Sequence, residues 1–182
     1  MQDFAQWSLD TIRAEGGCFS WMEEYRFDWA TKTLLALEQM LSAKTIVLIT
    51  DEKRKWVENY ILSNINSPQL ERPFLPIVSI DDIYPYFNRV DSAEMMDALE
   101  DMISLSYKNE YFFWYIGRGD DRRSDIAKRK ETSYFWIFDE EYLNAFNLKS
   151  YDKLLDVKLI QLYKLFNLSL NAAIFGEIEL GV

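Results

Sequence analysis

Acidic side chains follow three of the apolar runs that the sequence predicts as buried strands. They are Asp51-Glu52, Asp120-Asp121 and Asp139-Glu140-Glu141. In an open parallel sheet, ligands bind at the carboxyl ends of the strands. Carboxylates gathered there could hold Mg²⁺ or act as a pair in acid–base chemistry. A third interpretation, which we favour, is that each segment opens a helix, where carboxylates accept from free N–H groups and suit the dipole.

A glycine loop, Gly117-Arg118-Gly119, separates the apolar run 111–116 from a short predicted helix at 124–129. A strand, a glycine loop and a helix N-terminus can together cradle a phosphate. This loop lacks the third glycine of the pattern G-x-G-x-x-G, and two aspartates follow it, although nearby arginines offset their charge. The segment TDEKRKW (50–56) has no glycine at all. We therefore expect the glycines to serve chain reversal rather than phosphate binding.

The composition removes several kinds of catalysis. The 182 residues include no histidine, which excludes His-based general catalysis, Ser-His and Cys-His nucleophile systems, and nearly every zinc site. Cys18 is the single cysteine, so the chain can form neither an internal disulfide nor a thiolate cluster. No basic side chain lies near Cys18 in sequence, so we interpret it as a structural residue.

The formal net charge of −10 repels phosphate backbones and disfavours direct binding to nucleic acid. A basic partner, or a neutral partner with a basic patch, is favoured instead. The N-terminal segment MQDFAQWSLDTIRAEGG lacks the pattern of a signal peptide. No apolar run reaches the roughly 18 residues that a membrane span needs. We expect a cytoplasmic protein with no membrane partner.

Apolar runs alternate with helical patterns along the chain. The runs predicted as strands are 44–50, 73–80, 111–117, 133–138 and 143–148. The predicted helices are 4–15, 27–41, 53–65, 91–106, 124–129 and 153–175. Pro76 argues for an edge position or a bulge in the second strand. Strands that are apolar throughout and alternate with helices imply a parallel sheet covered on both faces.

These patterns predict one α/β domain over residues 1–182. We expect a three-layer doubly wound sandwich with a roughly five-stranded parallel sheet, two N-terminal helices and a long C-terminal helix.

The predicted C-terminal helix is apolar around most of its circumference. Its polar residues form one narrow stripe: Lys158, Gln161, Lys164, Asn167 and Asn171. A helix buried nearly all round needs a second neighbour besides the sheet. Burial within the domain is one explanation, and self-association is the one we favour. The residues predicted to form the oligomer interface are Leu155, Leu159, Leu162 and Phe166.

The order of elements resembles the sugar isomerase (SIS) domain, in which the loops after the first and third strands bind a sugar phosphate through glycine, serine and threonine. TDEKRKW (50–56) and GRGDDRRS (117–124) stand in those places and depart from both patterns. A sugar-phosphate-binding isomerase or sensor stays as the alternative function. A magnesium-dependent phosphotransfer domain is a third possibility.

Three long segments resemble the HobA family of DnaA-associated replication initiation regulators: 56–81, 133–143 and 154–175. That family is similar in fold and role to DiaA, a non-enzymatic SIS-like protein. The resemblance implies a homotetramer whose subunits bind the N-terminal domain of DnaA and hold several initiators together at a bacterial replication origin. It implies no enzymatic activity, no cofactor and no direct contact with nucleic acid.

The resemblance to DiaA also points to the chain ends as the partner-binding site. The N-terminal segment of DiaA and an apolar pair near its C-terminus resemble Gln2 with Phe4, and Ile174 with Phe175, in this sequence. The rival interpretation is that Ile174 and Phe175 cap the core.

Overall fold

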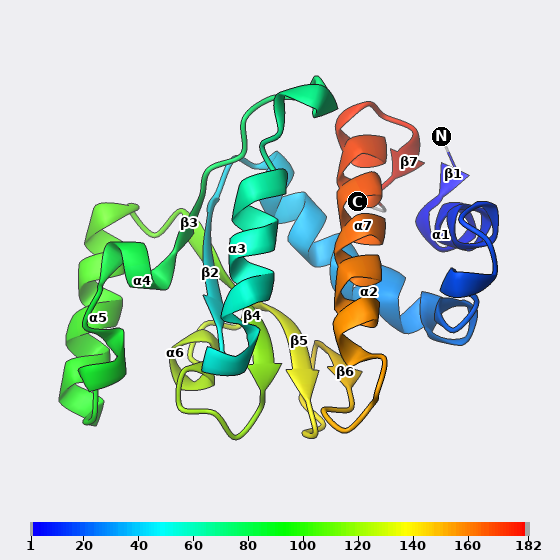
Figure 1. The fold of residues 1–182 in the computed structure, drawn as a ribbon. Coiled ribbons are helices and arrows are strands. Elements are labelled where there is room, and N and C mark those ends of the chain that lie inside the picture. Colours follow the sequence, from blue (N-terminus) through cyan, green and yellow to red (C-terminus); the bar gives the residue numbers. More distant parts are fainter. Residues whose placement is uncertain (1, 181–182) are drawn as a thin grey trace.

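The computed structural model describes residues 2–180, which form a three-layer α/β sandwich (Figure 1). Its main sheet has five parallel strands in the order β3-β2-β4-β5-β6. This arrangement confirms the predicted parallel sheet, including its fifth strand. The strands are β2 (Thr45–Thr50), β3 (Ile77–Ser79), β4 (Tyr111–Arg118), β5 (Tyr134–Phe138) and β6 (Ala145–Leu148).

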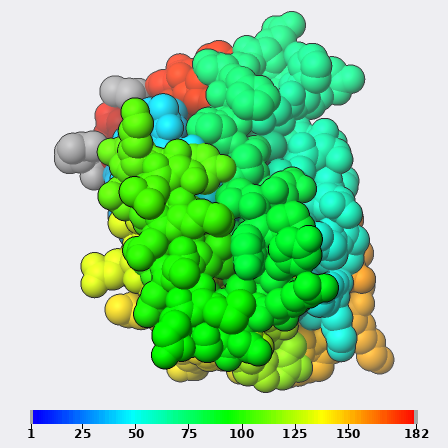
Figure 2. Space-filling view, turned by 90° about the vertical axis from the view of Figure 1, so that its left-hand side faces the viewer, coloured from blue at the N-terminus to red at the C-terminus, as the bar shows by residue number. Residues whose placement is uncertain are grey.

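Helices cover both faces of this sheet. One face carries α1 (Phe4–Ala14), α2 (Met22–Leu41), α3 (Lys55–Asn64) and α7 (Leu155–Ile174). The other carries α4 (Ile80–Ile83), α5 (Ala93–Ser106) and α6 (Ser124–Lys128), and Figure 2 looks onto α4 and α5. Short 3₁₀ turns lie at Gly17–Phe19, Glu52–Arg54, Pro68–Leu70 and Phe87–Arg89. Within residues 2–180, no helix is long and apolar enough to cross a membrane.

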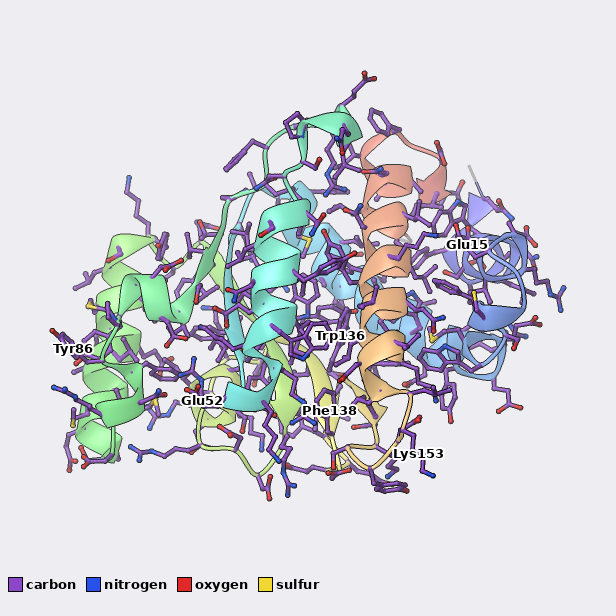
Figure 3. The ribbon with its side chains drawn as sticks, in the orientation of Figure 1. Glu15, Glu52, Tyr86, Trp136, Phe138 and Lys153 are labelled. Carbon is purple, nitrogen blue, oxygen red and sulfur yellow. The ribbon has the colours of Figure 1, made fainter. Side chains whose placement is uncertain are left out.

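Successive strand residues point alternately into two separate cores. Ile46 and Leu48 of β2 face the core under α2, α3 and α7, whereas Val47 and Ile49 face the core under α5 and α6. Trp136 of β5 lies fully buried in the larger core (Figure 3). Because both faces are covered, the strands are apolar throughout rather than alternating.

Helix α2 begins at Met22, five residues before the predicted start at residue 27. Met22 is fully buried, and Glu23 and Glu24 in the first turn suit the positive end of the helix dipole. The additional turns add to the helical layer over β5 and β6.

Strand β3 is shorter than predicted and lies at the sheet edge, as Pro76 indicates. A proline has no N–H to donate to a neighbouring strand. The Pro76 carbonyl still accepts from the Ile46 N–H at 2.8 Å, so the chain runs alongside β2 before the strand begins.

A second sheet, which pattern reasoning did not predict, joins the chain ends. Strand β1 (Gln2–Asp3) pairs in parallel with β7 (Ile178–Glu179). The two segments lie beside α1 and the end of α7 (Figure 1). Strands of two residues carry no periodic signal in the sequence.

Candidate functional site

Asp51, which follows β2, is buried and hydrogen-bonded within the chain. Its carboxylate accepts from the backbone N–H groups of Arg54 at 3.0 Å and Arg118 at 2.9 Å, and it pairs with the Arg54 guanidinium at 3.2 Å. The first bond caps the turn that leads into α3, which confirms the predicted N-cap. The second holds the end of β4 beside the end of β2, so Asp51 has a structural role.

Glu58 of α3 is a second buried carboxylate at this edge of the sheet. It accepts from the hydroxyls of Thr50 and Ser79 and from the Lys55 ammonium group at 2.6 Å. Thr50 and Ser79 end β2 and β3, so Glu58 ties α3 to both strands. A buried charge is tolerated only when it is paired and hydrogen-bonded in this way.

Arg123 fills the space between the loops that follow β2 and β4, and only 6% of the residue is exposed. Its Nε donates to the Thr50 carbonyl at 2.7 Å, Nη1 to Asn88 at 2.6 Å and Nη2 to Asp81 at 2.7 Å. The guanidinium also lies 4.8 Å from the centre of the Phe87 ring. This is the topological switch point, where an open α/β sheet binds its ligands. Here a side chain of the protein occupies it.

The other acidic segments are also partnered. Asp121 accepts from the Arg123 N–H at 2.8 Å and caps the turn before α6. The interpretation that each segment opens a helix is wrong for Asp139, which accepts from the Ser150 N–H at 2.8 Å and joins the loops after β5 and β6. Residues 2–180 hold no group of three or more Asp, Glu, His or Cys side chains that could bind a metal.

A cavity of about 300 Å³ is left beside Arg123. Its lining includes Glu52 and Asp121 besides Arg122, and Glu52 lies at the carboxyl-end edge of the sheet (Figure 3). These two carboxylates offset the charges of Arg122 and Arg123, so the lining offers a phosphate group no net positive charge. The geometry therefore disfavours a sugar phosphate at this edge.

Gly117 and Gly119, the two glycines of the loop at 117–119, leave room for carboxylate side chains. A Cβ atom at Gly117 would lie 2.7 Å from the Tyr115 hydroxyl and 2.9 Å from an Asp51 carboxylate oxygen. A Cβ atom at Gly119 would overlap the Glu140 side chain. Neither glycine has a positive φ. The expected role in chain reversal therefore does not explain the two glycines. They are required because a Cβ atom would overlap neighbouring side chains.

The variant Gly117→Ala is expected to lower the free energy of unfolding by about 1–3 kcal/mol, because the added methyl group displaces the buried Asp51 carboxylate. Urea denaturation measures the loss. Gly17→Ala is the matched control, since nothing lies within 4 Å of its added Cβ atom, and its effect should stay within about 0.5 kcal/mol. Equal unfolding midpoints for the two variants would contradict the packing role of Gly117.

The pKa of Asp81 lies below the usual range of an aspartate. Burial acts to raise it, but the hydrogen bonds and charges of Arg123 and Lys55 outweigh that effect. A carboxyl group whose pKa is lowered by folding adds stability above its unfolded-state pKa of about 3.9. That contribution is lost as the pH falls through the folded-state pKa.

Asp81→Asn is therefore expected to lower the urea midpoint at pH 7 and to lower it less at pH 3, because pH 3 lies below the unfolded-state pKa of about 3.9 and part of the stabilisation is already lost there. Asp82→Asn, at the exposed neighbouring residue, serves as the control and should show the same small difference at both pH values. A deficit of the Asp81 variant that does not change with pH would contradict the linkage.

The structure brings the two predicted partner-binding segments together at the chain ends. The Gln2 N–H donates to the Glu177 carbonyl at 3.1 Å, and Phe175 is 57% exposed. Ile174 is half-buried against the core. Phe4 departs from the predicted role as a contact residue, because its side chain is buried. Its ring stacks on that of Trp7, with the ring centres 6.0 Å apart. A partner can touch Gln2 and Phe175, whereas Phe4 acts only through packing.

The predicted oligomer interface on α7 is also corrected. Leu155, Leu159, Leu162 and Phe166 lie in the core of the same chain, each at most 5% exposed. The Phe166 ring centre lies 4.6 Å from that of Trp114 in β4. These four side chains form the stripe of α7 that faces the sheet and have no surface to offer to a second copy.

A different set of apolar residues is exposed where α3 and α7 run side by side (Figure 1). Tyr60 and Ile160 line one groove between the two helices, and the rings of Tyr60 and Tyr163 are 5.5 Å apart. We call this surface the α3–α7 face; its exposed members are Trp56, Tyr60, Leu154, Val157 and Ile160. This surface was not identified from the sequence, because Trp56 and Tyr60 share their helical spacing with the buried Val57 and Ile61 of α3. The spacing of three between residues 154, 157 and 160 was the available signal.

The fold and this edge of the sheet define a class: a doubly wound α/β protein whose strand-end cleft is largely filled by its own charged side chains. Within that class the chain belongs to the HobA family of DNA replication regulators, whose family model matches residues 1–180. The resemblance seen in the sequence is thereby confirmed.

Relatives of known structure support this assignment. The chain is 28% identical to the DNA replication regulator protein HobA of Helicobacter pylori, over 99% of this chain and all of that protein. It is similar to the crystal structure of a HobA–DnaA (domain I–II) complex from Helicobacter pylori, with a TM-score of 0.75 and 28% identity over 98% of this chain and 99% of that one. The crystal structure of HobA from the same organism gives a TM-score of 0.74 and 27% identity with the same coverage.

Proposed function

We propose that this protein is a non-enzymatic regulator of chromosomal replication initiation that binds the N-terminal domain of its cognate DnaA. As a homotetramer it would hold several initiator molecules together at the origin. The observation that carries the proposal is the similarity, over 98% of the chain, to a HobA solved in complex with domains I–II of DnaA. Copies of an initiator held on one scaffold meet each other at a high effective concentration.

The charge and the filled cleft agree with this role. A net charge of −10 favours contact with the initiator protein rather than with DNA. At the strand ends, Asp51, Glu58 and Arg123 have their hydrogen-bonding groups directed at other groups of the chain. The surfaces left for function are therefore the outer faces of the helices and the chain ends.

We place self-association on the α3–α7 face. It combines a tryptophan, a tyrosine and aliphatic side chains, and tryptophan and tyrosine are among the residues that dominate binding energy at interfaces. A two-fold contact would bring the same face of each subunit together, so that every exposed apolar residue is used twice.

We place the initiator contact at the joined chain ends, with Gln2, Ile174 and Phe175 at its centre. Phe4 does not touch the partner but helps to hold the chain ends in position, because its helix α1 packs against α7 and β7. An exposed phenylalanine beside a polar strand edge gives both an apolar anchor and hydrogen-bonding groups.

Phe175→Ala is expected to raise the Kd for the DnaA N-terminal domain about tenfold or more, as the loss of an aromatic anchor does. Isothermal titration calorimetry measures the change. Tyr151→Ala is the control, because Tyr151 is 78% exposed and lies beyond the opposite end of α7, roughly 30 Å away at 1.5 Å per helical residue. If both variants bind the DnaA N-terminal domain with the same Kd, Phe175 is not part of the binding site.

Size-exclusion chromatography with light scattering, with and without the DnaA N-terminal domain, tests the whole proposal. We expect a mass of four 21.7 kDa chains that increases when the DnaA fragment is added. A mass of one chain would contradict the tetramer, and no complex at micromolar concentrations would contradict the function. Clear thermal stabilisation by a sugar phosphate would instead favour the isomerase or sensor alternative.

A further inference from the structure

The polar stripe of α7 contacts other segments of the same chain. Gln161, near its middle, holds the turn between α1 and α2: its side-chain oxygen accepts from Trp21 Nε1 at 2.8 Å, and its amide nitrogen donates to the Cys18 carbonyl at 2.9 Å. Asn167 and Asn171 contact the loop that joins α3 to β3, which lies beside the C-terminal end of α7 (Figure 1). The second of these contacts lies near the proposed initiator contact.

Arg72, which is half-buried, is the residue of this loop that meets α7. Its Nη1 donates to the side-chain oxygen of Asn171 at 2.6 Å, and its Nη2 donates to that of Asn167 at 2.7 Å. Nη2 also donates to the carbonyl of Ile65, the residue that follows the last turn of α3. Carbonyls at a helix end have no partner inside the helix. One guanidinium therefore holds the ends of two helices together, and we call these hydrogen bonds the Arg72 clamp.

The chemistry of the Arg72 clamp favours a single geometry. A guanidinium is planar and always charged, and it presents its donors in a rigid fork. Asn167 and Asn171 are four residues apart, so they lie on the same face of α7. The acceptors of Arg72 within residues 2–180 are amide and carbonyl oxygens rather than carboxylates. Hydrogen bonds from a charged donor are stronger than those between neutral groups, so the clamp fixes the end of α7 against the end of α3.

The Arg72 clamp lies one helical turn before the proposed initiator contact. Asn171 precedes Phe175 by four residues, which is about 6 Å along the helix axis. The Phe175 N–H donates to the Asn171 carbonyl at 2.9 Å, so the residue that Arg72 holds also carries a hydrogen bond of the last helical turn. Directly after Phe175 the chain leaves the helix at Gly176, whose φ is 71°. Helix ends fray, and the clamp acts against fraying at the turn that presents Phe175.

We propose that Arg72 is a positioning residue for the initiator contact. By holding the last turn of α7 against the end of α3, it fixes Phe175 in the orientation that the DnaA N-terminal domain binds. Arg72 itself does not touch the partner, because its donors are directed at Asn167, Asn171 and Ile65. A contact residue that is already ordered loses less conformational entropy on binding, which raises the affinity. This role rests on the proposed binding of DnaA.

Arg72→Met is expected to raise the Kd for the DnaA N-terminal domain about three- to tenfold, as substitutions that act on a site without touching its ligand do. Isothermal titration calorimetry with the full-length protein measures the change. Arg89→Met is the matched control: it removes the same charge, and Arg89 is exposed in the 3₁₀ turn on the other face of the sheet. Asn171→Ala breaks the clamp from the other side without changing the net charge, and it should raise the Kd as well.

The fold should survive the loss of the clamp, because the loop is also closed at its base. The Asn66 side chain accepts from the Leu75 N–H at 2.9 Å and donates to the Leu75 carbonyl at 2.9 Å. The free ¹⁵N-labelled protein then reports positioning directly. In ¹H–¹⁵N correlation spectra, Arg72→Met should shift the backbone signals of Phe175 and Gly176, whereas Arg89→Met should not. Unshifted Phe175 and Gly176 signals in the Arg72 variant would overturn the proposal.

A double-variant cycle separates positioning from direct contact with the partner. If Arg72 acts through Phe175, Arg72→Met should change the Kd by less than about twofold once Phe175→Ala is present, since two residues of one unit are not additive. The full three- to tenfold effect in that background would overturn the proposal, because Arg72 would then act on the partner itself or through another residue.

Failure of this role can be told apart from failure of the proposed function. A wild-type Kd for Arg72→Met, beside a raised Kd for Phe175→Ala, would overturn the role of Arg72 and leave the binding of DnaA intact. If the wild-type protein does not bind the DnaA N-terminal domain at all, the proposed function is wrong and the role of Arg72 falls with it.

Discussion

Replacing Arg123 by methionine is expected to lower the free energy of unfolding by about 3 kcal/mol, which is the low end of the range for breaking a buried ion pair. The guanidinium donates to Thr50, Asn88 and Asp81, and methionine can make none of these bonds. The Thr50 carbonyl is left unpaired between β2 and the loop after β4. The loss stays at the low end because Asp81 keeps its contact with Lys55 and is partly exposed.

Urea unfolding followed by tryptophan fluorescence measures this effect. Arg122→Met is a close control, because Arg122 is the preceding residue in the chain and is exposed, so its effect should stay within about 0.5 kcal/mol. Arg123→Lys should give an intermediate loss, since lysine keeps the charge but lacks the planar fork of donors. If Arg123→Met unfolds at the wild-type urea concentration, the network does not stabilise the strand-end loops.

If the proposed homotetramer forms through the α3–α7 face, the double variant Val157→Glu, Ile160→Glu is expected to reduce the mass in solution from four chains to one or two. Both side chains lie on the α3–α7 face, 51% and 39% exposed in the single chain. A carboxylate buried without a partner in an apolar contact costs several kcal/mol, more than most interfaces tolerate. Folding of the single chain should be preserved, because neither side chain belongs to the core.

Light scattering measures the mass, and circular dichroism verifies that the fold is kept. Leu105→Glu on α5 is the matched control, since it is 82% exposed and lies in the helical layer on the other face of the sheet. The control should keep the mass of the wild-type protein. A tetrameric double variant would place self-association elsewhere, and a monomeric one should bind single DnaA fragments without the gain from multivalency.

Much of the fold follows from local patterns. The run at 44–50 is β-branched and apolar, which predicts a buried strand. Pro76 predicts an edge position or a bulge for the second strand, and the structure shows the edge position. Asp51 was correctly interpreted as a helix cap because that role depends on residues three positions apart. The start of α2 and the strands at the chain ends depend on packing and on long-range pairing, which local spacing does not report.

The sequence by itself determined the α/β class, the strand order along the chain and the absence of histidine chemistry, because period and composition are local properties. The tertiary structure decided which side of α7 faces the sheet. The polar stripe of this helix is narrow and leaves most of its circumference apolar, so the packing of Phe166 against Trp114 decides which apolar side faces the sheet. The structure also decided why residue 117 is a glycine: Asp51, 66 positions earlier in the chain, needs the space that a Cβ atom would occupy.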